Sequence, residues 1–428
     1  MARHPRGCDA VTRALHTSVA VVGGGVLGCS AALHLKLSGC DSVALIERDS
    51  IGSGTSSAGA GLLARWSAGF VPAWAEQELE IEAYGLDFYR KLSEAGHEFG
   101  YRENGTLFLG SARPSGLKSL RPFAHQGVDD LALLTPTEVE DLTEGLVRDA
   151  GVAGGVLDRR GARVSAGATA RALADRFSEL GGANIEHEPV MSVRRRRMRG
   201  FVLETGTGSV TCETLVVAAG GWTNTILRAF DTWLPVVPLM ATRLTTDTVQ
   251  VPPTLPSIQF CDGHRIYLRE DFGSLVWGCS YESEPRYAFV ERDLPTVLDG
   301  LPLGCVAEMK RAAQELVQAV PALFHPRVAR AAHGAPCYTA DLKPLVGELP
   351  SVPDLYVVAG DNYAGVTHAP GVGRLLAELV TRAKDPSVDP YAYRPERFED
   401  EYRNGAEVVE GMRLTAARTA LAARGRGS

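Results

Sequence analysis

The chain begins with short apolar runs separated by a segment of helical spacing. Val19–Val22 is an apolar run followed by glycines, residues 26–37 have the spacing of a helix, and Val43–Ile46 is a second apolar run that ends at Glu47. Short apolar runs bounded by turn residues are typical of buried strands. The pattern therefore predicts a strand, a tight turn, a helix and a second strand with a carboxylate at its tip.

Three glycines in this stretch have the spacing that a dinucleotide requires. Gly23 permits the tight turn, Gly25 lets the backbone approach a pyrophosphate, and Gly28 lets the helix and strand pack closely. The helix N-terminus offers free N–H groups to the phosphates. Glu47 can accept hydrogen bonds from both hydroxyls of an adenosine ribose, which argues against an NADP phosphate, although Arg48 is adjacent. We expect a bound dinucleotide; the alternative is an ordinary glycine turn.

The remaining pattern predicts further α/β structure. Helices are expected over residues 73–96, 135–145 (begun by Thr135 and Pro136), 164–180, 305–320 and from about Pro370. Strands are expected within 103–110, around Ile185, within 191–219 and at Leu355–Ala359, and residues 236–280 suggest an antiparallel sheet. The helix near Pro370 follows a glycine-rich loop, so its N-terminus is a second expected anion-stabilising site.

Composition narrows the class of protein. The 428 residues are 45% apolar and 22% charged, with a formal net charge of −7, so we expect no binding to nucleic acid or to an anionic membrane. Arg194–Arg197 is expected at a solvated hairpin tip. No apolar run reaches the roughly 18 residues of a membrane helix, and residues 1–17 suggest a polar flexible arm. The eight cysteines lack metal-site spacing, so we expect reduced thiols, no metal and a cytoplasmic location.

Elements that suit a dinucleotide occur at the start, the middle and the end of the chain. Besides the first glycine turn, a buried strand stops at Gly220–Gly221, and the strand 355–359 runs into a loop with Gly360 and Gly365. A nicotinamide dehydrogenase usually keeps its dinucleotide domain in one block. A discontinuous domain with a substrate sheet inserted favours a flavoprotein.

At this point the chain resembles a known family, the FAD-dependent amine and D-amino-acid oxidoreductases, over residues 18–398. This family includes glycine oxidase, sarcosine oxidases, and dimethylglycine and sarcosine dehydrogenases. The resemblance is carried by the blocks "VAVVGGGVLGCSAALHL…VALIER", "GSGTSSAGAG", "GARVSAGATARALADRFSELGGANI" with "TLVVAAGGWTNTIL", and "HGAPCYTADLKPLVGELPSVPDLYVVAGDNYAGVTHAPGVGRLLAELV". The segment "DGHRIYLREDFGSLVWGCSYE" is similar to the sheet that lines the substrate pocket in these enzymes.

The resemblance implies an α/β fold, with a discontinuous Rossmann-type FAD-binding domain and an inserted antiparallel-sheet substrate domain. The FAD-binding domain is expected at 18–95, 155–225 and 330–398, the substrate domain at 96–154 and 226–329, and a peripheral arm and tail at 1–17 and 399–428. The residues expected to hold FAD are Gly23, Gly25, Val26, Gly28, Glu47, Arg48, Gly54, Thr55, Ser56, Ser57, Val190, Ala219, Gly220, Trp222, Gly360, Tyr363, Ala364, Gly365, Val366 and Thr367.

Departures from the family pattern bear on how flavin and substrate are held. Ser57 stands where the dehydrogenase branch carries a flavin-linking histidine, and Cys337 lies closer to its aspartate than the linking cysteine of sarcosine oxidases. We therefore expect non-covalent FAD. Ala335–Pro336 replaces the arginine that grips the substrate carboxylate in relatives, so either the carboxylate anchor differs or the substrate lacks a free carboxylate. Val276–Trp277 replaces a lysine that assists oxygen, so fast oxidase activity does not follow from the resemblance.

The candidate substrate contacts and catalytic residues are Tyr267, Arg65, His264, Asn362 and Tyr363. His368 is expected either to approach the flavin or to cap the following helix. Arg269 and Lys343 are expected to be solvated.

The expected function is FAD-dependent removal of a hydride from the carbon next to nitrogen of a small amine or amino acid, which gives an imine. Oxygen or another acceptor is expected to take the electrons. Two alternatives stay open. One is oxidation of a 2-hydroxy acid or polyol, which needs a base to remove the hydroxyl proton. The other is a flavin-binding regulatory protein or subunit without catalysis.

Overall fold

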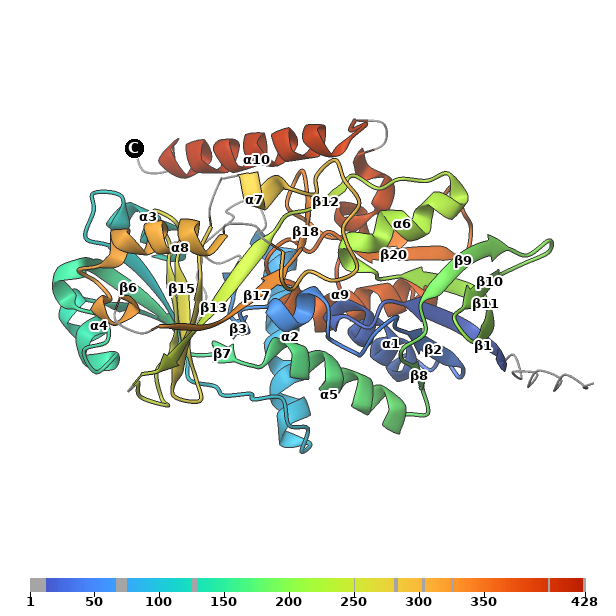
Figure 1. Cartoon of the computed structure of the whole chain (residues 1–428), viewed down its shortest axis with the longest axis horizontal. Coiled ribbons are helices and arrows are strands. Elements are labelled where there is room, and N and C mark those ends of the chain that lie inside the picture. The colour runs from blue at the N-terminus through green and yellow to red at the C-terminus, as the bar shows by residue number, and fades with distance from the viewer. Residues whose placement is uncertain are drawn as a thin grey trace, which may run out of the picture.

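Two mixed sheets, each of eight strands in the described part of the chain, organise the molecule (Figure 1). The computed structural model describes residues 13–66, 75–124, 130–249, 251–280, 284–301, 305–324, 327–398 and 401–425. The first sheet draws its strands from both ends and the middle of the sequence. The second is built from the segments between them.

The first sheet is parallel at its centre. Its main strand order is β19–β20–β11–β1–β2–β8, and β19 alone on this path runs antiparallel to its neighbour. A hairpin, β9 and β10, extends β11. The strands are β1 (Arg13–Val22), β2 (Val43–Ile46), β8 (Ala183–Ile185), β9 (Val190–Arg195), β10 (Phe201–Thr205), β11 (Gly208–Val217), β19 (Leu345–Glu348) and β20 (Leu355–Ala359).

Four helices pack around this sheet and one another. They are α1 (Val26–Leu37), α2 (Ala75–Glu94), α5 (Ala166–Glu179) and α9 (Gly365–Val380), and α1 contacts both α5 and α9. Burial of Leu33, Leu45, Tyr89 and Leu375 in one cluster joins these helices to the sheet. A parallel sheet of this kind places the carboxyl ends of β1, β11 and β20 at one edge, which is where ligands bind in such folds.

The second sheet has the order β17–β13–β16–β15–β14–β4–β6–β5. Most pairs are antiparallel as predicted, but β14 pairs with β4 in parallel. Its strands are β4 (Thr106–Ser111), β5 (Leu131–Leu134), β6 (Val152–Asp158), β13 (Ala241–Thr248), β14 (Ser257–Phe260), β15 (Tyr267–Asp271), β16 (Ser274–Gly278) and β17 (Val328–Gly334). Beside it lie α3 (Gly116–Ala124), α4 (Pro136–Leu142) and α8 (Cys305–Ala313). The Thr135 cap of α4 is confirmed as a capping box with Glu138.

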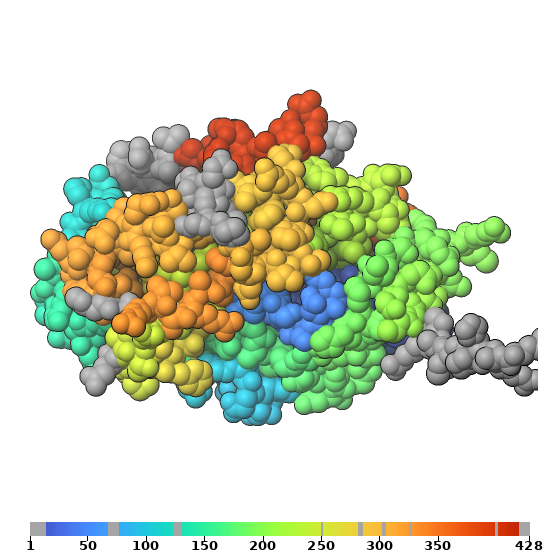
Figure 2. All heavy atoms as spheres, in the orientation of Figure 1, coloured from blue at the N-terminus to red at the C-terminus, as the bar shows by residue number. Residues whose placement is uncertain are grey.

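Short elements complete the structure between the sheets. β3 (Leu62–Leu63) pairs with β7 (Ala162–Arg163), and β12 (Val236–Pro238) pairs with β18 (Cys337–Thr339). The remaining helices of the described residues are α6 (Thr223–Leu227), α7 (Glu284–Tyr287) and α10 (Gly405–Gly425), and α10 contacts β12 and β18. Figure 1 shows α10, in red, running along the top of the molecule over α7. Figure 2 shows α10 beside the yellow-orange segment that follows α7.

Several predicted boundaries were wrong. β1 begins at Arg13, inside the predicted arm, because residues 13–17 extend the pairing with β11; residues 1–12 lie outside the described part. The domain boundaries at 154/155 and 329/330 cut β6 and β17, which belong whole to the second sheet. α8 ends at Ala313 and continues only as a 3-10 turn, and α9 begins at Gly365 instead of Pro370. The tail is not merely peripheral, since Val408 and Met412 of α10 are buried.

None of the helices in the described residues combines the length and the apolar character needed to cross a membrane.

Candidate functional site

A cavity of about 1360 Å³ lies between the two sheets, at the carboxyl edge of β1, β11 and β20. One end is lined by Glu47, Arg48 and Trp222. The other end is lined by Gln259 and Tyr267 of the second sheet. The cavity therefore joins the dinucleotide turn to the predicted substrate sheet.

The glycine turn has the geometry that its spacing predicts. Gly23 has φ +113°, and a Cβ there would lie 2.4 Å from the carbonyl oxygen of Ala218. A Cβ on Gly28 would lie 1.8 Å from the carbonyl oxygen of Gly23, so Gly28 serves close packing and does not line the cavity. Gly25 differs, because its nearest neighbour would be the Ser56 hydroxyl at 3.3 Å. Gly25 thus leaves open space at the N-terminus of α1.

Glu47 ties the turn together while it faces the cavity. Its Oε2 accepts a hydrogen bond from the Gly24 N–H at 2.6 Å, and its Oε1 accepts one from the Asp49 N–H at 2.9 Å. Each carboxylate oxygen has a second lone pair for a ligand hydroxyl. Beside it, the Arg48 guanidinium lies 4.0 Å from the centre of the Trp222 ring. This end of the cavity offers a carboxylate, a cation and a flat aromatic surface.

The serine-rich loop after β2 forms a second wall. The Ser56 hydroxyl accepts a hydrogen bond from the Val26 N–H at 3.0 Å, and the Thr55 hydroxyl accepts one from the Ala335 N–H at 3.0 Å. The Ser57 hydroxyl instead donates to carbonyls within its own loop, and Ser57 does not line the cavity. The predicted solvation of Arg269 was wrong: it is 2% exposed and its Nε donates to the Ala60 carbonyl at 2.6 Å. Arg269 therefore holds this loop against the cavity.

The third wall is the loop after β20, which Asn362 fixes. Asn362 has φ +52°, its Nδ2 donates to the carbonyls of Leu342 and Gly360, and its Oδ1 accepts from the Thr339 N–H at 3.1 Å. Although Asn362 lines the cavity, its amide is thus engaged with the backbone. This geometry indicates a structural role.

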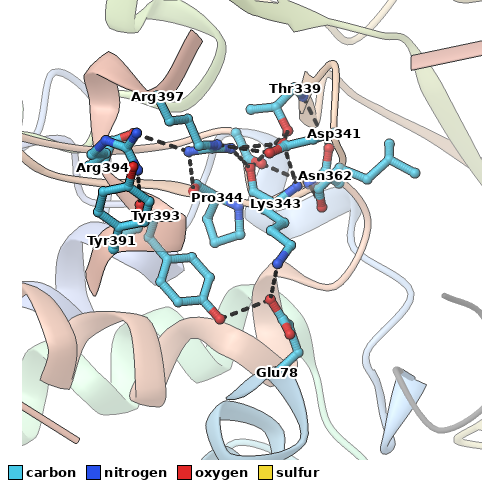
Figure 3. A network of polar contacts seen from close by, with 12 residues as sticks. Glu78, Thr339, Asp341, Lys343, Pro344, Asn362, Tyr391, Tyr393, Arg394 and Arg397 are labelled. Carbon is cyan, nitrogen blue, oxygen red and sulfur yellow. Dashed lines mark hydrogen bonds and ion pairs between the residues drawn. The ribbon is translucent and has the colours of Figure 1, made fainter. Parts of the chain in front are cut away.

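Figure 3 shows the wider network behind this loop. Asp341 forms two 2.8 Å contacts with Arg397, and Lys343 lies 3.3 Å from Glu78, which also accepts from the Tyr393 hydroxyl at 2.9 Å. The predicted solvation of Lys343 was therefore wrong as well. Segments from α2, the β18–β19 connection and residues 390–398 together hold the wall in place.

The start of α9 differs from the prediction because a tertiary contact compensates for its internal proline. Pro370 has no N–H for the Val366 carbonyl four residues earlier. The Tyr89 hydroxyl donates to that carbonyl at 2.7 Å instead. The helix can therefore begin at Gly365, directly beside the cavity.

Among the candidate substrate residues, Arg65 does not reach the cavity. Its Nη2 and Nε lie 2.5 and 3.2 Å from the two carboxylate oxygens of Asp158, and both side chains are buried. His264 lines the cavity with its Nδ1 2.7 Å from Glu315 Oε1. Tyr267 and Tyr363 also line it. Burial raises the pKa of Tyr267, so its phenol stays neutral at physiological pH.

Most predicted cofactor residues meet at this cavity. Those that line it are Gly23, Gly25, Val26, Glu47, Arg48, Gly54, Thr55, Ser56, Val190, Ala219, Gly220, Trp222, Gly360, Tyr363, Ala364, Gly365 and Val366. Gly28, Ser57 and Thr367 do not. Thr367 is buried, where its hydroxyl accepts from the Trp66 indole at 3.1 Å.

Sequence reasoning missed other lining residues, including Asp361, Arg286, Tyr338, Met412 and Arg413. The Arg286 guanidinium lies 5.6 Å from the Tyr338 ring centre, and that of Arg413 lies 5.3 Å from the ring of Tyr287, which follows Arg286. Arg413 lines the cavity because α10, to which it belongs, packs against β12 and β18. No local signal in the sequence predicts that contact.

Cys337 lines the cavity as a neutral thiol. Burial raises its pKa to about 12, and its Sγ donates to the Gly220 carbonyl at 3.5 Å. Because the thiolate is the nucleophilic form, Cys337 is unreactive at neutral pH.

Comparison with known proteins gives consistent matches. A family model described as "FAD dependent oxidoreductase" matches residues 18–379. The 4-methylaminobutanoate oxidase (formaldehyde-forming) of Paenarthrobacter nicotinovorans is 29% identical over 93% of this chain and 48% of its own length. Sarcosine oxidase subunit beta of Rhizobium meliloti is 26% identical over 92% of both chains. The crystal structure of glycine oxidase from Geobacillus kaustophilus is 27% identical over 90% of this chain and 99% of its own, with a TM-score of 0.73.

The chain spans less than half the length of several curated relatives it matches.

The cavity fits the cofactor of that family. Backbone of the glycine turn, the Gly54–Ser56 loop and Ala219–Gly220 converges on it, and a Cβ on Gly54 or Gly220 would meet nothing within 4 Å. Such open glycines let a ligand approach the backbone closely. The carboxylate of Glu47 suits ribose hydroxyls, and the N-terminus of α1 suits a pyrophosphate.

Proposed function

The chain belongs to the FAD dependent oxidoreductase family, and we propose that it oxidises the C–N bond of a small amino acid that carries a free carboxylate. Bound FAD would accept a hydride from the substrate carbon next to nitrogen, and the nitrogen would then lose a proton to solvent, so that the product is an imine. FAD is held non-covalently in this proposal, because Cys337 is a neutral thiol and the Ser57 hydroxyl is engaged in its own loop.

The observation that carries the substrate assignment is the charge of the cavity away from Glu47. The described lining residues include the cations Arg265, Arg286 and Arg413, of which Arg286 is the partly buried one, while the lining carboxylates of Asp293, Glu315 and Asp361 are paired with Arg228, His264 and His368. Partly enclosed guanidinium groups favour a bound carboxylate. We assign that role to Arg286, because the Met240 N–H donates to its carbonyl at 2.8 Å and fixes its backbone beside Tyr338.

Amine oxidation and hydroxy-acid oxidation make different demands on the cavity walls. An amine must lose its proton before it can give up a hydride, and burial of the substrate ammonium away from water lowers its pKa. Hydroxyl oxidation needs a base. His264 is the one histidine among the described lining residues, and its Nδ1 lies 2.7 Å from Glu315 Oε1, so its Nε2 is the nitrogen that could act as such a base; the names of the relatives, not the cavity walls, favour amine chemistry.

Anaerobic reduction of the FAD-loaded protein tests this function. An N-alkyl amino acid, the unsubstituted amino acid, the matching amine without a carboxylate and a 2-hydroxy acid are each added, and loss of the oxidised-flavin absorbance is followed. We expect the amino acids to reduce the flavin faster than the other two compounds. Reduction by the hydroxy acid alone supports that alternative, and no reduction by any compound supports a protein without catalysis.

Arg286→Leu tests the carboxylate assignment, with Arg292→Leu as the control because Arg292 is exposed and does not line the cavity. We expect KM for the amino acid to rise at least tenfold, about 1.4 kcal/mol, with a small effect on kcat. The amine without a carboxylate loses little. Equal losses on both compounds contradict the assignment.

A further inference from the structure

A buried amide of the second sheet has one end that the protein itself does not use. Gln259 of β14 is 7% exposed and lines the cavity. Its Nε2 donates to the carbonyls of Phe260 at 2.7 Å and Arg265 at 3.0 Å. Because a carbonyl can only accept a hydrogen bond, both contacts must come from the amide nitrogen, and the orientation of the amide is fixed. Its oxygen, Oε1, is therefore the end that is turned away from these two carbonyls.

Oε1 lacks a partner within the protein. In the described parts of the chain no N–H or O–H group donates to Oε1, and this oxygen is not one of the polar side-chain atoms that the surrounding protein seals off completely. An amide oxygen that lies largely out of water without a donor is unfavourable. A donor is therefore expected from a molecule that binds in the cavity.

The buried histidine of α9 does not offer a comparable group. His368 does not line the cavity, and its Nε2 and Nδ1 lie 3.1 and 2.9 Å from carboxylate oxygens of Glu82 and Asp361. The prediction that His368 either approaches the flavin or caps α9 was therefore wrong.

Strand register explains why the Gln259 amide is left uncovered. Gln259 of β14 is paired with Tyr267 of β15, and Tyr267 is paired with Gly278 of β16. Residues directly opposite one another in antiparallel strands project from the same face of the sheet. A Cβ on Gly278 would lie 2.6 Å from Cε1 of Tyr267, so the tyrosine ring lies over β16. Because β16 and β14 flank β15 on opposite sides, the ring leans away from Gln259.

We propose that Gln259 Oε1 accepts a hydrogen bond from an N–H group of the substrate amine, so that the site selects amino acids whose neutral nitrogen still carries a hydrogen. This inference rests on the proposed function and narrows its substrate class to unsubstituted and N-monoalkyl amino acids, as opposed to N,N-dialkyl ones. The amine is the partner because an ionised substrate carboxylate has no hydrogen to donate. The substrate is favoured over FAD because Gln259 belongs to the second sheet, at the cavity end opposite Glu47 and Trp222.

The reaction itself strengthens this hydrogen bond. When the carbon next to nitrogen gives up its hydride to FAD, the nitrogen lone pair forms the C=N double bond and the nitrogen gains positive charge, so its N–H becomes a stronger donor. An acceptor that binds more tightly at this stage lowers the barrier of the step. The N–H proton then passes to solvent, which yields the imine. A neutral N,N-dialkyl amine has no N–H and leaves Oε1 unpaired.

Anaerobic flavin reduction by an N-methyl amino acid and by its N,N-dimethyl counterpart tests the proposal, in the FAD-loaded parent protein and in Gln259→Met. Asn184→Leu is the matched control, because its Nδ2 also donates to a backbone carbonyl, that of Ala174 at 3.0 Å, but Asn184 does not line the cavity. We expect the parent protein to react at least tenfold faster with the N-methyl compound. Gln259→Met should slow that reaction at least tenfold and leave the N,N-dimethyl reaction within about threefold. Asn184→Leu should lower the melting temperature and keep the parent preference.

The ratio of the two rate constants separates a substrate contact from a structural role. A fold defect slows both compounds alike, so an equal loss on both in Gln259→Met overturns the proposal. A parent protein that reacts equally fast with both compounds overturns it without any variant. A preference that persists in Gln259→Met also overturns it: a raised Kd for FAD then assigns the oxygen to the cofactor, and an unchanged Kd indicates crowding of the second methyl group. If neither compound reduces the flavin of the parent protein, the proposed function itself fails.

Discussion

Substitutions at two glycines of the same turn should separate an effect on cofactor binding from an effect on folding stability. In Gly28→Ala the new methyl group lies 1.8 Å from the Gly23 carbonyl oxygen, a backbone atom that cannot move without opening the turn. In Gly25→Ala the methyl group meets only the Ser56 hydroxyl, at 3.3 Å, and Gly25 has φ −72° and ψ 175°, which alanine adopts readily. Both substitutions add one methyl group, but Gly28→Ala should lower the folding stability and Gly25→Ala should weaken FAD binding.

The expected magnitudes follow from these distances. Overpacking of this kind costs typically 1–3 kcal/mol, and the short backbone contact puts Gly28→Ala at or above the top of that range. Gly25→Ala should leave the unfolding free energy within about 0.5 kcal/mol, because its one contact, at 3.3 Å, is with a side-chain hydroxyl that can shift by a few tenths of an ångström. Its methyl group instead occupies space where the pyrophosphate must approach α1. We expect the Kd for FAD to rise at least tenfold, about 1.4 kcal/mol.

Thermal melting of each apoprotein, with and without FAD, measures both effects. The parent protein at an FAD concentration of one hundred times Kd should gain about 2.7 kcal/mol. Gly28→Ala should melt lower in either condition, while Gly25→Ala should melt like the parent without FAD and lose at least about half of the gain. If Gly25→Ala keeps the full FAD stabilisation, the pyrophosphate does not lie at this turn.

Three further predictions concern buried polar groups. Arg65→Leu leaves the buried Asp158 carboxylate unpaired, so it should lower the unfolding free energy by about 3–5 kcal/mol in a denaturant titration and leave KM unchanged. A raised KM with unchanged stability would instead indicate that Arg65 contacts the substrate. Tyr89→Phe removes the donor to the Val366 carbonyl and should lower the unfolding free energy by about 1–3 kcal/mol. If the variant is as stable as the parent protein, the Tyr89 hydroxyl does not compensate for the missing N–H of Pro370. Burial lowers the pKa of His34 to about 4, so the folded state keeps it neutral while the unfolded state takes up a proton below about pH 6.5. Stability should therefore fall from pH 6.5 toward pH 4 by up to roughly 1.4 kcal/mol per pH unit, and the same slope in His34→Gln contradicts the assignment.

Local patterns predicted the first sheet and the cofactor turn because their chemistry is local. The turn at Gly23, the cap at Thr135 and the strand 355–359 depend on neighbouring residues, and each was found where the pattern put it. The α9 boundary failed for the opposite reason. Pro370 is normally a first helical residue, and the hydroxyl that compensates for it comes from Tyr89, far away in the sequence.

At the site, too, the sequence pattern did not predict which charged side chains reach the cavity. Arg65 and Arg269 looked like a ligand and a solvated cation, yet distant partners, Asp158 and the Ala60 carbonyl, bury both. Conversely, Arg413 reaches the cavity only because α10 folds back over β12 and β18. Which cation faces the substrate is therefore decided by tertiary contacts that spacing along the chain does not encode.

The most direct test of the account is the anaerobic spectrum of the FAD-loaded protein mixed with an N-alkyl amino acid. The account predicts that the absorbance of the oxidised flavin disappears, and that the matching amine without a carboxylate is much slower. A protein that binds no FAD, or whose bound flavin stays oxidised with every amino acid offered, contradicts it.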